Sequence, residues 1–345
     1  MHISDFDYEL PEELIAQHPL PERDAARMLV VNRADGTLED QQFVSLPSYL
    51  RAGDCLVLNN TKVFPARLLG QRIPTGGSVE VLLLREIEPL TWQVLARPAR
   101  RLRIGTGISF GGSKLNAVVI GANADGTRVI QFDEREDLWK IIDDFGRTPL
   151  PPYIKRDPGA AVEDRERYQT IYAQETGAIA APTAGLHFTP QVLEQVKRSK
   201  VHVAEITLHV GYGTFEPVRV SDVSEHRVLP EQFAISKEAA AVVNESRGSG
   251  GRVVAVGTTT TRALESSASE NGEVKAVAGV ADLTITPSYK FRAVGALLTN
   301  FHLPRSSLLL LVSAFAGRSL MLDAYRHAVR QRYRFYSYGD CMLII

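Results

Sequence analysis

The sequence has little cysteine, no long apolar run and almost no net charge. Its 345 residues include two cysteines, Cys55 and Cys341, which are too few and too far apart for a disulfide framework or a paired-cysteine metal site. The longest apolar run, residues 308–316, falls far short of the ~20 residues that a membrane-spanning helix needs. The N-terminus is acidic and lacks the apolar segment of a signal peptide, so we expect a cytoplasmic protein.

A formal net charge of −1 means that any nucleic-acid binding must come from local basic patches. Two stretches are candidates for contact with phosphates. Their arginines are Arg97, Arg100, Arg101 and Arg103 in the first stretch, and Arg330, Arg332 and Arg334 in the second. A charged solvent-exposed loop would explain the first stretch equally well. In the second, the aromatic residues between the arginines could instead pack a C-terminal strand.

The length and the spacing of apolar segments predict two domains. From residue 68 to residue 149, short apolar strands alternate with glycine-containing turns, which is typical of a small antiparallel β-barrel. Residues 1–67 and 150–345 instead contain apolar strands followed by polar turns and helix starts. We therefore predict an α/β protein: a larger α/β domain with a barrel-like mixed sheet and flanking helices, into which residues 68–149 are inserted.

Several polar segments directly follow apolar strands of the larger domain. The strand predicted at residues 55–58 runs into Asn60, Thr61 and Lys62. Alternation along residues 201–210 places Glu205 and His209 on one strand face, a mixture of groups that suits general acid–base catalysis. A half-exposed strand would show the same pattern.

Two further segments combine a turn with the start of a helix. His187 precedes a helix that begins at Thr189-Pro190, and an imidazole beside a helix N-terminus can serve a charged small molecule. A simple turn with a hydrogen-bonded histidine remains the alternative there. Thr258 and Thr259 follow an apolar strand and a glycine, a cradle for a carboxylate or phosphate without a P-loop motif.

Histidines also raise the possibility of a metal centre, because four of the eight lie between residues 187 and 226. No HExxH motif occurs, and the spacing of His202 and His209 puts them on opposite faces of a strand. We therefore expect no metal. The polar segments at strand ends are expected to meet at one edge of the sheet and to bind a charged, nucleotide-like ligand.

Unusual strings occur in one order along nearly the whole chain. They lie at residues 8–17, 60–68, 167–173, 180–189, 207–215, 257–259, 298–304 and 333–340. With these strings the sequence resembles the S-adenosylmethionine:tRNA ribosyltransferase-isomerase family of queuosine biosynthesis. It departs from the family pattern at residues 228–231, where a Met-His pair is expected, and at Ser288, where a glycine is usual in a turn that we expect to survive.

The resemblance implies a larger α/β domain with an inserted small β-barrel. It also implies transfer and isomerisation of the ribosyl part of S-adenosylmethionine onto 7-aminomethyl-7-deazaguanine at the wobble position of tRNA. The product would be epoxyqueuosine-tRNA, with adenine and methionine released. S-adenosylmethionine would be consumed as a co-substrate, so no cofactor and no metal are expected, and the enzyme would be a cytoplasmic monomer.

Carried onto this sequence, the resemblance implies three groups of site residues. The expected catalytic residues are His187, His209 and Glu205. The expected substrate-binding residues are Asn60, Thr61, Lys62, Tyr168, Pro182, Thr183, Ala184, Gly185, Gly211, Thr214, Thr258, Thr259, Asn300, His302, Tyr338 and Asp340. The seven arginines named above would bind tRNA. The alternatives are a non-catalytic RNA-binding protein and an RNA-independent nucleoside-type transferase on the same scaffold.

Overall fold

The computed structural model describes residues 1–112, 114–133, 138–156, 161–215 and 218–345. The chain forms two compact units. The larger unit comprises Met1–Lys62, Pro152–Lys155 and Gln169–Ile345, and the barrel unit comprises Val63–Pro151 and Arg156–Tyr168. The sequence predicted a single inserted segment at residues 68–149, whereas the barrel unit also includes residues 156–168.

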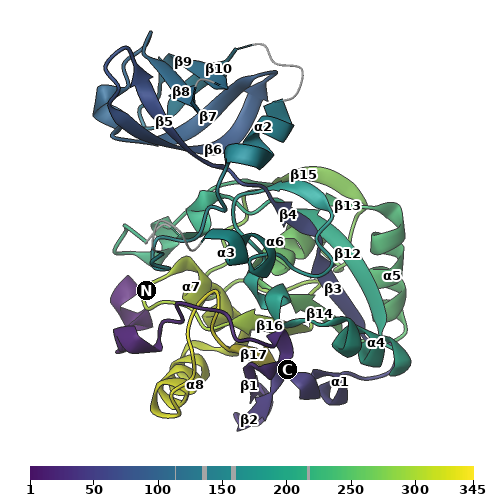
Figure 1. Cartoon of the computed structure of the whole chain (residues 1–345). Helices are drawn as coiled ribbons and strands as arrows, with labels where there is room; N and C mark the ends of the chain where they lie inside the picture. Colours follow the sequence, from purple (N-terminus) through teal and green to yellow (C-terminus); the bar gives the residue numbers. More distant parts are fainter. Residues whose placement is uncertain (113, 134–137, 157–160, 216–217) are drawn as a thin grey trace. The chain divides into compact units, whose positions relative to one another are not determined.

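The larger unit is built on a nine-stranded mixed sheet in the order β15-β13-β12-β3-β14-β16-β17-β1-β2 (Figure 1). Its strands are β1 (Arg27–Val31), β2 (Leu38–Gln42), β3 (Cys55–Asn59), β12 (His202–Leu208), β13 (Glu231–Ile235), β14 (Val253–Val256), β15 (Val277–Ala281), β16 (Ala296–Asn300) and β17 (Cys341–Ile344). Strands β12, β3, β14 and β16 run parallel to one another. Their carboxyl ends therefore lie at one edge of the sheet, as the sequence predicted.

The apolar runs explain which strands are central. β3, β14 and β16 are buried along their whole length, as expected for strands covered on both faces. β12 alternates between buried and partly exposed residues, in agreement with the predicted alternation. The Asp35-Gly36 turn joins β1 and β2 into a hairpin, and Gly36 has φ of 75°.

Helices pack against this sheet. They are α1 (Leu46–Tyr49), α4 (Pro190–Arg198), α5 (Lys237–Gly248), α6 (Thr258–Ser267), α7 (Ser307–Ala316) and α8 (Arg318–Arg330). Thr189 caps α4 and Ser306 caps α7 by accepting backbone N–H groups. The apolar residues Leu322, Tyr325 and Val329 predict an amphipathic helix at α8, and the structure buries Tyr325 but leaves Leu322 and Val329 only partly buried.

Short elements complete the larger unit. The 3-10 helices are η1 (Ile3–Phe6), η2 (Glu12–Leu14), η3 (Arg23–Ala25), η4 (Phe43–Ser45), η6 (Thr183–His187), η7 (Tyr212–Phe215) and η8 (Val223–Glu225). β11 (Glu175–Ala178) pairs with β4 (Thr61–Val63). The turn at Ser288 survives, because Tyr289 N donates to Thr286 O, and Ser288 adopts φ of 100°.

Among the described residues, no helix alone has the length and apolar character to cross a bilayer. Only α7 and α8 taken together reach that length and composition, and they are bent by 117° relative to each other.

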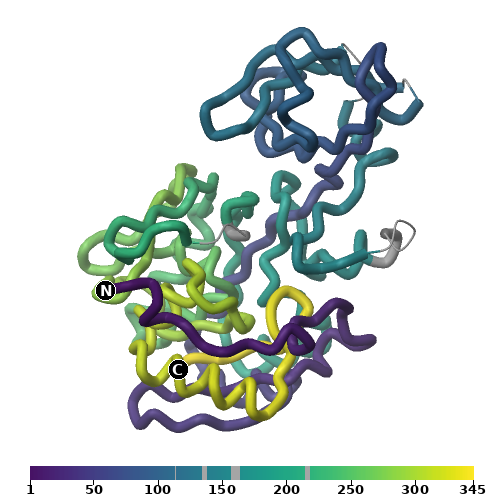
Figure 2. Tube along the Cα trace, turned by 90° about the vertical axis from the view of Figure 1, so that its left-hand side faces the viewer, coloured from purple at the N-terminus to yellow at the C-terminus, as the bar shows by residue number. Residues whose placement is uncertain are grey.

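The barrel unit is a closed antiparallel barrel in the order β10-β7-β6-β5-β8-β9, seen as a closed ring of blue tube in Figure 2. Its strands are β5 (Arg67–Ile73), β6 (Ser78–Glu88), β7 (Thr91–Arg97), β8 (Gly107–Phe110), β9 (Leu115–Ala122) and β10 (Arg128–Phe132), accompanied by η5 (Ala99–Arg101), α2 (Leu138–Phe145) and α3 (Ala161–Arg167). Phe64, Trp92 and Trp139 pack together with ring centroids 5.6–5.9 Å apart. The predicted α/β fold class with a small β-barrel is confirmed.

Candidate functional site

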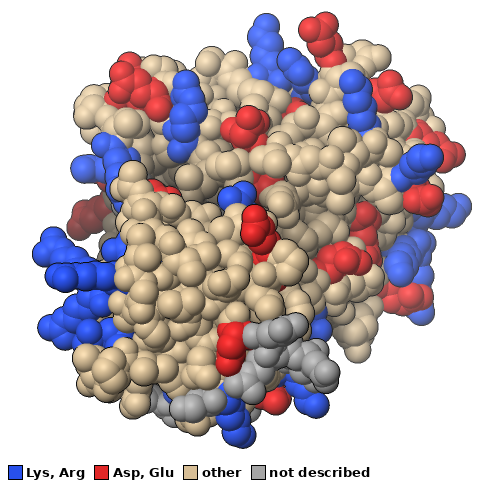
Figure 3. All heavy atoms as spheres, turned by 90° about the horizontal axis from the view of Figure 1, so that it is seen from above, with Lys and Arg blue, Asp and Glu red and all other residues tan. Residues whose placement is uncertain are grey.

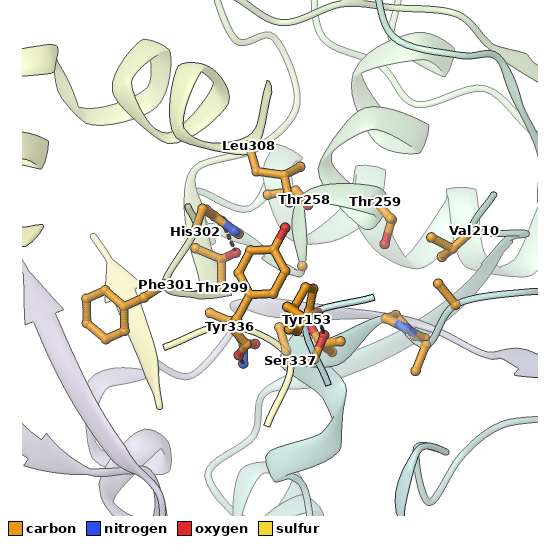
Figure 4. Close-up of a pocket in the computed structure, with 17 residues that line it drawn as sticks. Tyr153, Val210, Thr258, Thr259, Thr299, Phe301, His302, Leu308, Tyr336 and Ser337 are labelled. Carbon is orange, nitrogen blue, oxygen red and sulfur yellow. Dashed lines mark hydrogen bonds between the residues drawn. The ribbon is translucent and has the colours of Figure 1, made fainter. Parts of the chain in front are cut away.

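A pocket lies at the carboxyl ends of β12, β14 and β16 (Figure 4). The pocket contains about 530 Å³ of empty space, part of which is open to solvent. Its walls come from segments far apart in the sequence. The lining residues are Tyr153, Ala180, Ala181, Pro182, Thr183, Ala184, Val210, Gly257, Thr258, Thr259, Thr299, Asn300, Phe301, His302, Leu308, Tyr336 and Ser337.

One wall of the pocket is the N-terminus of α6. Gly257 takes φ of 93° at the end of β14 and supplies no capping side chain. The first turn of a helix leaves backbone N–H groups without intrahelical acceptors, and that end of the dipole is positive. The hydroxyl of Thr260 donates back to Val256 O, so it does not occupy these N–H groups. The wall at Thr258 and Thr259 is therefore suited to an anionic group.

His302 is the one imidazole among the described residues that line the pocket. It is buried, and burial lowers its pKa to about 3, so the ring is neutral near pH 7. Its Nε2 shares a hydrogen bond of 3.0 Å with Thr299 Oγ1. The backbone around it is fixed by Tyr325, whose hydroxyl accepts from His302 N, and by Tyr8, whose hydroxyl donates to His302 O.

Asn300 presents an unsatisfied acceptor in the same wall. The residue is 2% exposed, and its Nδ2 donates to Tyr336 O at 2.9 Å, while its Oδ1 has no hydrogen-bond partner. Behind it, His187 is also buried and its Nε2 has no partner. Burial lowers the pKa of His187 to about 4, although contacts with the Arg23 backbone and the Asn300 side chain raise it. Neutral His187 thus supports this wall from outside the lining.

A second polar cluster joins the end of β3 to the end of β12. Asn60 Oδ1 accepts from Thr207 Oγ1 at 2.7 Å, and Thr61 Oγ1 shares a hydrogen bond of 2.8 Å with His209 Nδ1. Burial lowers the pKa of His209. The structure therefore brings three predicted residues together, but their cluster is not among the residues that line the pocket.

Asn59, which is not among the site residues expected from the sequence, ties this cluster to the pocket. Its amide accepts from Leu208 N at 3.0 Å and donates to Leu208 O at 2.9 Å, and it reaches Thr259 Oγ1 at 3.4 Å. The residue is fully buried. An asparagine in an otherwise apolar strand was the signal that could have identified Asn59 as a site residue.

A buried ion pair holds the chain just beyond the pocket residue Val210. Glu231 accepts the Gly211 N–H at 2.8 Å and pairs with Arg262 of α6. Arg262 also donates to Ala281 O at 2.8 Å. The pair thereby connects α6 to the segment that follows β12.

The comparisons with known proteins give the chain a family. A model described as queuosine biosynthesis protein matches residues 3–344. The chain belongs to the queuosine biosynthesis protein family.

Similar members of the queuosine biosynthesis family align along their full length. Proteins named S-adenosylmethionine:tRNA ribosyltransferase-isomerase from Moorella thermoacetica, Halothermothrix orenii and Symbiobacterium thermophilum are 51%, 49% and 51% identical, with 100% of each chain covered. The crystal structure of an S-adenosylmethionine tRNA ribosyltransferase from Thermotoga maritima is similar with a TM-score of 0.56 and 39% identity. That match covers 99% of this chain and 100% of the other.

Part of the site expected from the family resemblance lines the pocket. These residues are Pro182, Thr183, Ala184, Thr258, Thr259, Asn300 and His302. The other expected residues lie outside the lining: His187, His209, Glu205, Asn60, Thr61, Lys62, Tyr168, Gly185, Gly211, Tyr338 and Asp340. Tyr168 is buried in the barrel unit, Lys62 is exposed, and the side chain of Thr214 falls outside the described residues.

Asp340 has a structural explanation. One carboxylate oxygen accepts Arg27 N at 2.9 Å and the other accepts Arg334 N at 2.7 Å. The nearby aromatic side chains of Tyr333 and Phe335 are fully buried, so they pack the core, as in the alternative left open by the sequence. The arginines between these aromatic residues are not alike. Arg334 donates a hydrogen bond to a backbone oxygen, whereas Arg330 and Arg332 are exposed.

The first basic stretch is exposed throughout. Arg97, Arg100, Arg101 and Arg103 all lie on the surface of the barrel unit. Lys and Arg side chains gather along the left edge of the face drawn in Figure 3. No group of three or more possible metal ligands occurs in the part of the chain that the structure describes.

Several residues that line the pocket were not predicted from the sequence. Tyr153 and Ser337 share a hydrogen bond, and Tyr336 stands beside them with φ of 77° (Figure 4). Tyr336 and Ser337 belong to the string at residues 333–340, and that string was the signal that could have identified them. Nothing in the spacing marked Tyr153, which comes from the connector after the barrel.

Proposed function

We propose that this chain is an S-adenosylmethionine:tRNA ribosyltransferase-isomerase. It transfers and isomerises the ribosyl part of S-adenosylmethionine onto 7-aminomethyl-7-deazaguanine at the tRNA wobble position, and releases adenine and methionine. The observation that carries the proposal is the 49–51% identity, over 100% of both chains, with proteins of that name. We further propose a cytoplasmic monomer that needs neither metal nor resident cofactor.

The pocket is the site at which we place S-adenosylmethionine. The α6 N-terminus at Thr258 and Thr259 is suited to the methionine carboxylate. Asn300 Oδ1 lacks a partner and would accept a hydrogen bond from an amino group of the ligand, since an unpaired buried acceptor costs about 1–3 kcal/mol. An apolar wall at Leu308 and Phe301 would exclude water from the remainder.

The reaction needs a base for a ribose proton beside the sulfonium and an acid for the departing adenine. His302 is our candidate for proton exchange, because it lines the pocket and is neutral near pH 7. His187 would act as a positioning residue behind Asn300. His209 and Glu205 remain expected contributors from the family resemblance, but the pocket lining does not include them.

Adenine release from S-adenosylmethionine is the direct test. The enzyme should release adenine in the presence of tRNA that carries 7-aminomethyl-7-deazaguanine, and not with unmodified tRNA or without tRNA. Release without RNA would support an RNA-independent transferase instead. Binding of the tRNA without adenine release or S-adenosylmethionine binding would support a non-catalytic RNA-binding protein.

Histidine variants test the assignment within the pocket. His302→Gln should reduce the rate of adenine release by about 10²–10⁴-fold, the usual contribution of a positioned acid or base. His202→Gln is the matched control, because His202 is exposed at the start of β12, far along the strand from its carboxyl end. Near-normal turnover of a folded His302→Gln protein, with loss of activity in His209→Gln, would place the chemistry in the second polar cluster.

A further inference from the structure

The outer face of the barrel carries a groove that is separate from the pocket of the larger unit. It contains about 1390 Å³ of empty space open to solvent. Its lining comes from β5, β6 and β8, from the end of β7 and from the residues that follow β7 and β8. These residues are Leu69, Gly70, Gln71, Ser78, Val79, Glu80, Arg97, Pro98, Ser109, Gly111 and Gly112.

The strand register explains the shape of the groove. Gln71 of β5 lies between Ser78 of β6 and Ser109 of β8 in adjacent register. Both neighbours are small, and Gly111 and Gly112 follow at the end of β8, so few side chains rise from the floor. The result is a shallow channel across the strands.

The groove offers both polar and apolar contacts. The side chains of Gln71 and Ser78 form no hydrogen bond with any residue that the structure describes, so their donors and acceptors are available to a ligand. Leu69 is 45% exposed, which is unusual for a side chain of its size in a barrel of this kind. An apolar surface beside amide and hydroxyl groups suits the face and the edge of a nucleobase.

Arg97 gives the groove an exposed positive charge. Between Glu88 and Asp125 the sequence contains no acidic residue, while it contains four arginines and one lysine. Arg97 lines the groove, and none of the four arginines pairs with an acidic side chain among the described residues. Glu80, the acidic residue in the groove, is paired with Arg67 at 3.1 Å. An exposed arginine without an acidic partner, in a stretch of the barrel that carries four arginines, favours a polyanion over a peptide or a second copy of this near-neutral chain.

We propose that this groove binds a single-stranded segment of RNA, with Arg97 on a phosphate, Leu69 against a base and Gln71 on a base edge. The identity of that RNA as the substrate tRNA rests on the function proposed above. The groove would raise affinity for the RNA without taking part in the ribosyl transfer.

Steady-state kinetics of adenine release test the proposal. Arg97→Ala and Gln71→Ala should each raise KM for the modified tRNA, by about tenfold for the arginine, which loses a charge-assisted contact. The kcat and the KM for S-adenosylmethionine should stay unchanged. Arg85→Ala is the control, because Arg85 is an exposed arginine of the same barrel that does not line the groove. The log–log salt dependence of RNA binding should flatten by about 0.7 for Arg97→Ala.

Cross-linking supplies a second readout that does not depend on activity. Replacement of Leu69 with a photoreactive phenylalanine analogue in the full chain should give a covalent adduct with a short synthetic anticodon stem-loop. The same analogue at Ile87, also exposed on the barrel but outside the groove, should give much less.

The outcomes separate the two proposals. Unchanged KM and salt dependence in Arg97→Ala, in an enzyme whose wild type releases adenine, would overturn the groove and leave the function standing. Adducts formed with a second copy of the chain instead of RNA would also overturn it. Failure of the wild type to release adenine would overturn the function, while RNA cross-linking at Leu69 would still support the groove.

Discussion

The substitution Arg262→Met should lower the free energy of unfolding of the larger unit by about 4 kcal/mol. The Arg262 side chain is 8% exposed and that of Glu231 is 4% exposed, so the change leaves a carboxylate buried without its counter-charge. Breaking a buried pair in this way costs about 3–5 kcal/mol. Glu231 keeps the Gly211 N–H, which moderates the loss, but Ala281 O and Leu283 O each lose a donor.

Removing the charge on both sides should recover part of this loss. In Glu231→Gln/Arg262→Met the amide oxygen can still accept the Gly211 N–H, and no buried charge remains. We therefore expect the double variant to be more stable than the sum of the two single effects predicts, by well over the ~0.5 kcal/mol that is usual for independent sites.

Urea denaturation followed by two probes makes the measurement specific. Both tryptophans, Trp92 and Trp139, belong to the barrel unit, so their fluorescence reports the barrel. Far-ultraviolet circular dichroism reports mainly α4–α8 of the larger unit. The substitution should shift the dichroism transition and leave the fluorescence transition in place. Strictly additive single effects, or a loss below about 1 kcal/mol for Arg262→Met, would refute the reasoning.

Three further predictions concern stability. Ser288→Gly should raise the free energy of unfolding by about 1 kcal/mol in urea denaturation, because Ser288 has φ of 100°; a decrease would contradict this. The free energy of unfolding should fall as pH drops from about 6.5 to 4. Burial lowers the pKa of His187 in the folded state to about 4, so in this pH range the unfolded chain binds more protons than the folded chain. His187→Gln should flatten this pH dependence. Asp54 is buried, which raises its pKa, but hydrogen bonds from Arg252 lower the pKa more. The ionised Asp54 therefore stabilises the fold above about pH 4, and this stabilisation is lost below that pH. The free energy of unfolding of Asp54→Asn should differ from that of the wild type only at the higher pH.

The arrangement of the larger unit follows closely from its apolar runs. Apolar segments predicted the strands β3 and β14, which are buried and parallel in the structure, and the polar turns after such strands were expected to meet at one edge. This is why Thr258 was found in advance, whereas Asn300 was expected only from the family resemblance.

The choice among histidines could not be made from the sequence. His187, His209 and His302 each stand beside a strand end, but which of them faces a cavity depends on side-chain directions set by packing. His187 lies under the wall against Phe43, and His209 points to Thr61. Contacts such as that of Glu231 with Arg262 join residues too far apart in the sequence for spacing to indicate them.

The barrel shows the same limit in another form. The predicted alternation of short apolar strands and turns does not extend to β5, whose one fully buried residue is Leu68 and whose exposed positions include Leu69 and Ile73. With apolar residues on both faces, β5 has no clear alternation to detect. The groove proposed for RNA crosses this strand.

The position of β17 has a consequence for synthesis on the ribosome. This strand lies between β16 and β1, so the β1–β2 hairpin joins the other strands of its sheet only through residues 341–344. The hairpin is among the first segments to be translated, and its partner is translated some 300 residues later, at a rate of about 5–20 residues per second. During that interval the nascent chain carries an open strand edge at Met28–Val31, and folding of the larger unit is tied to the completion of translation.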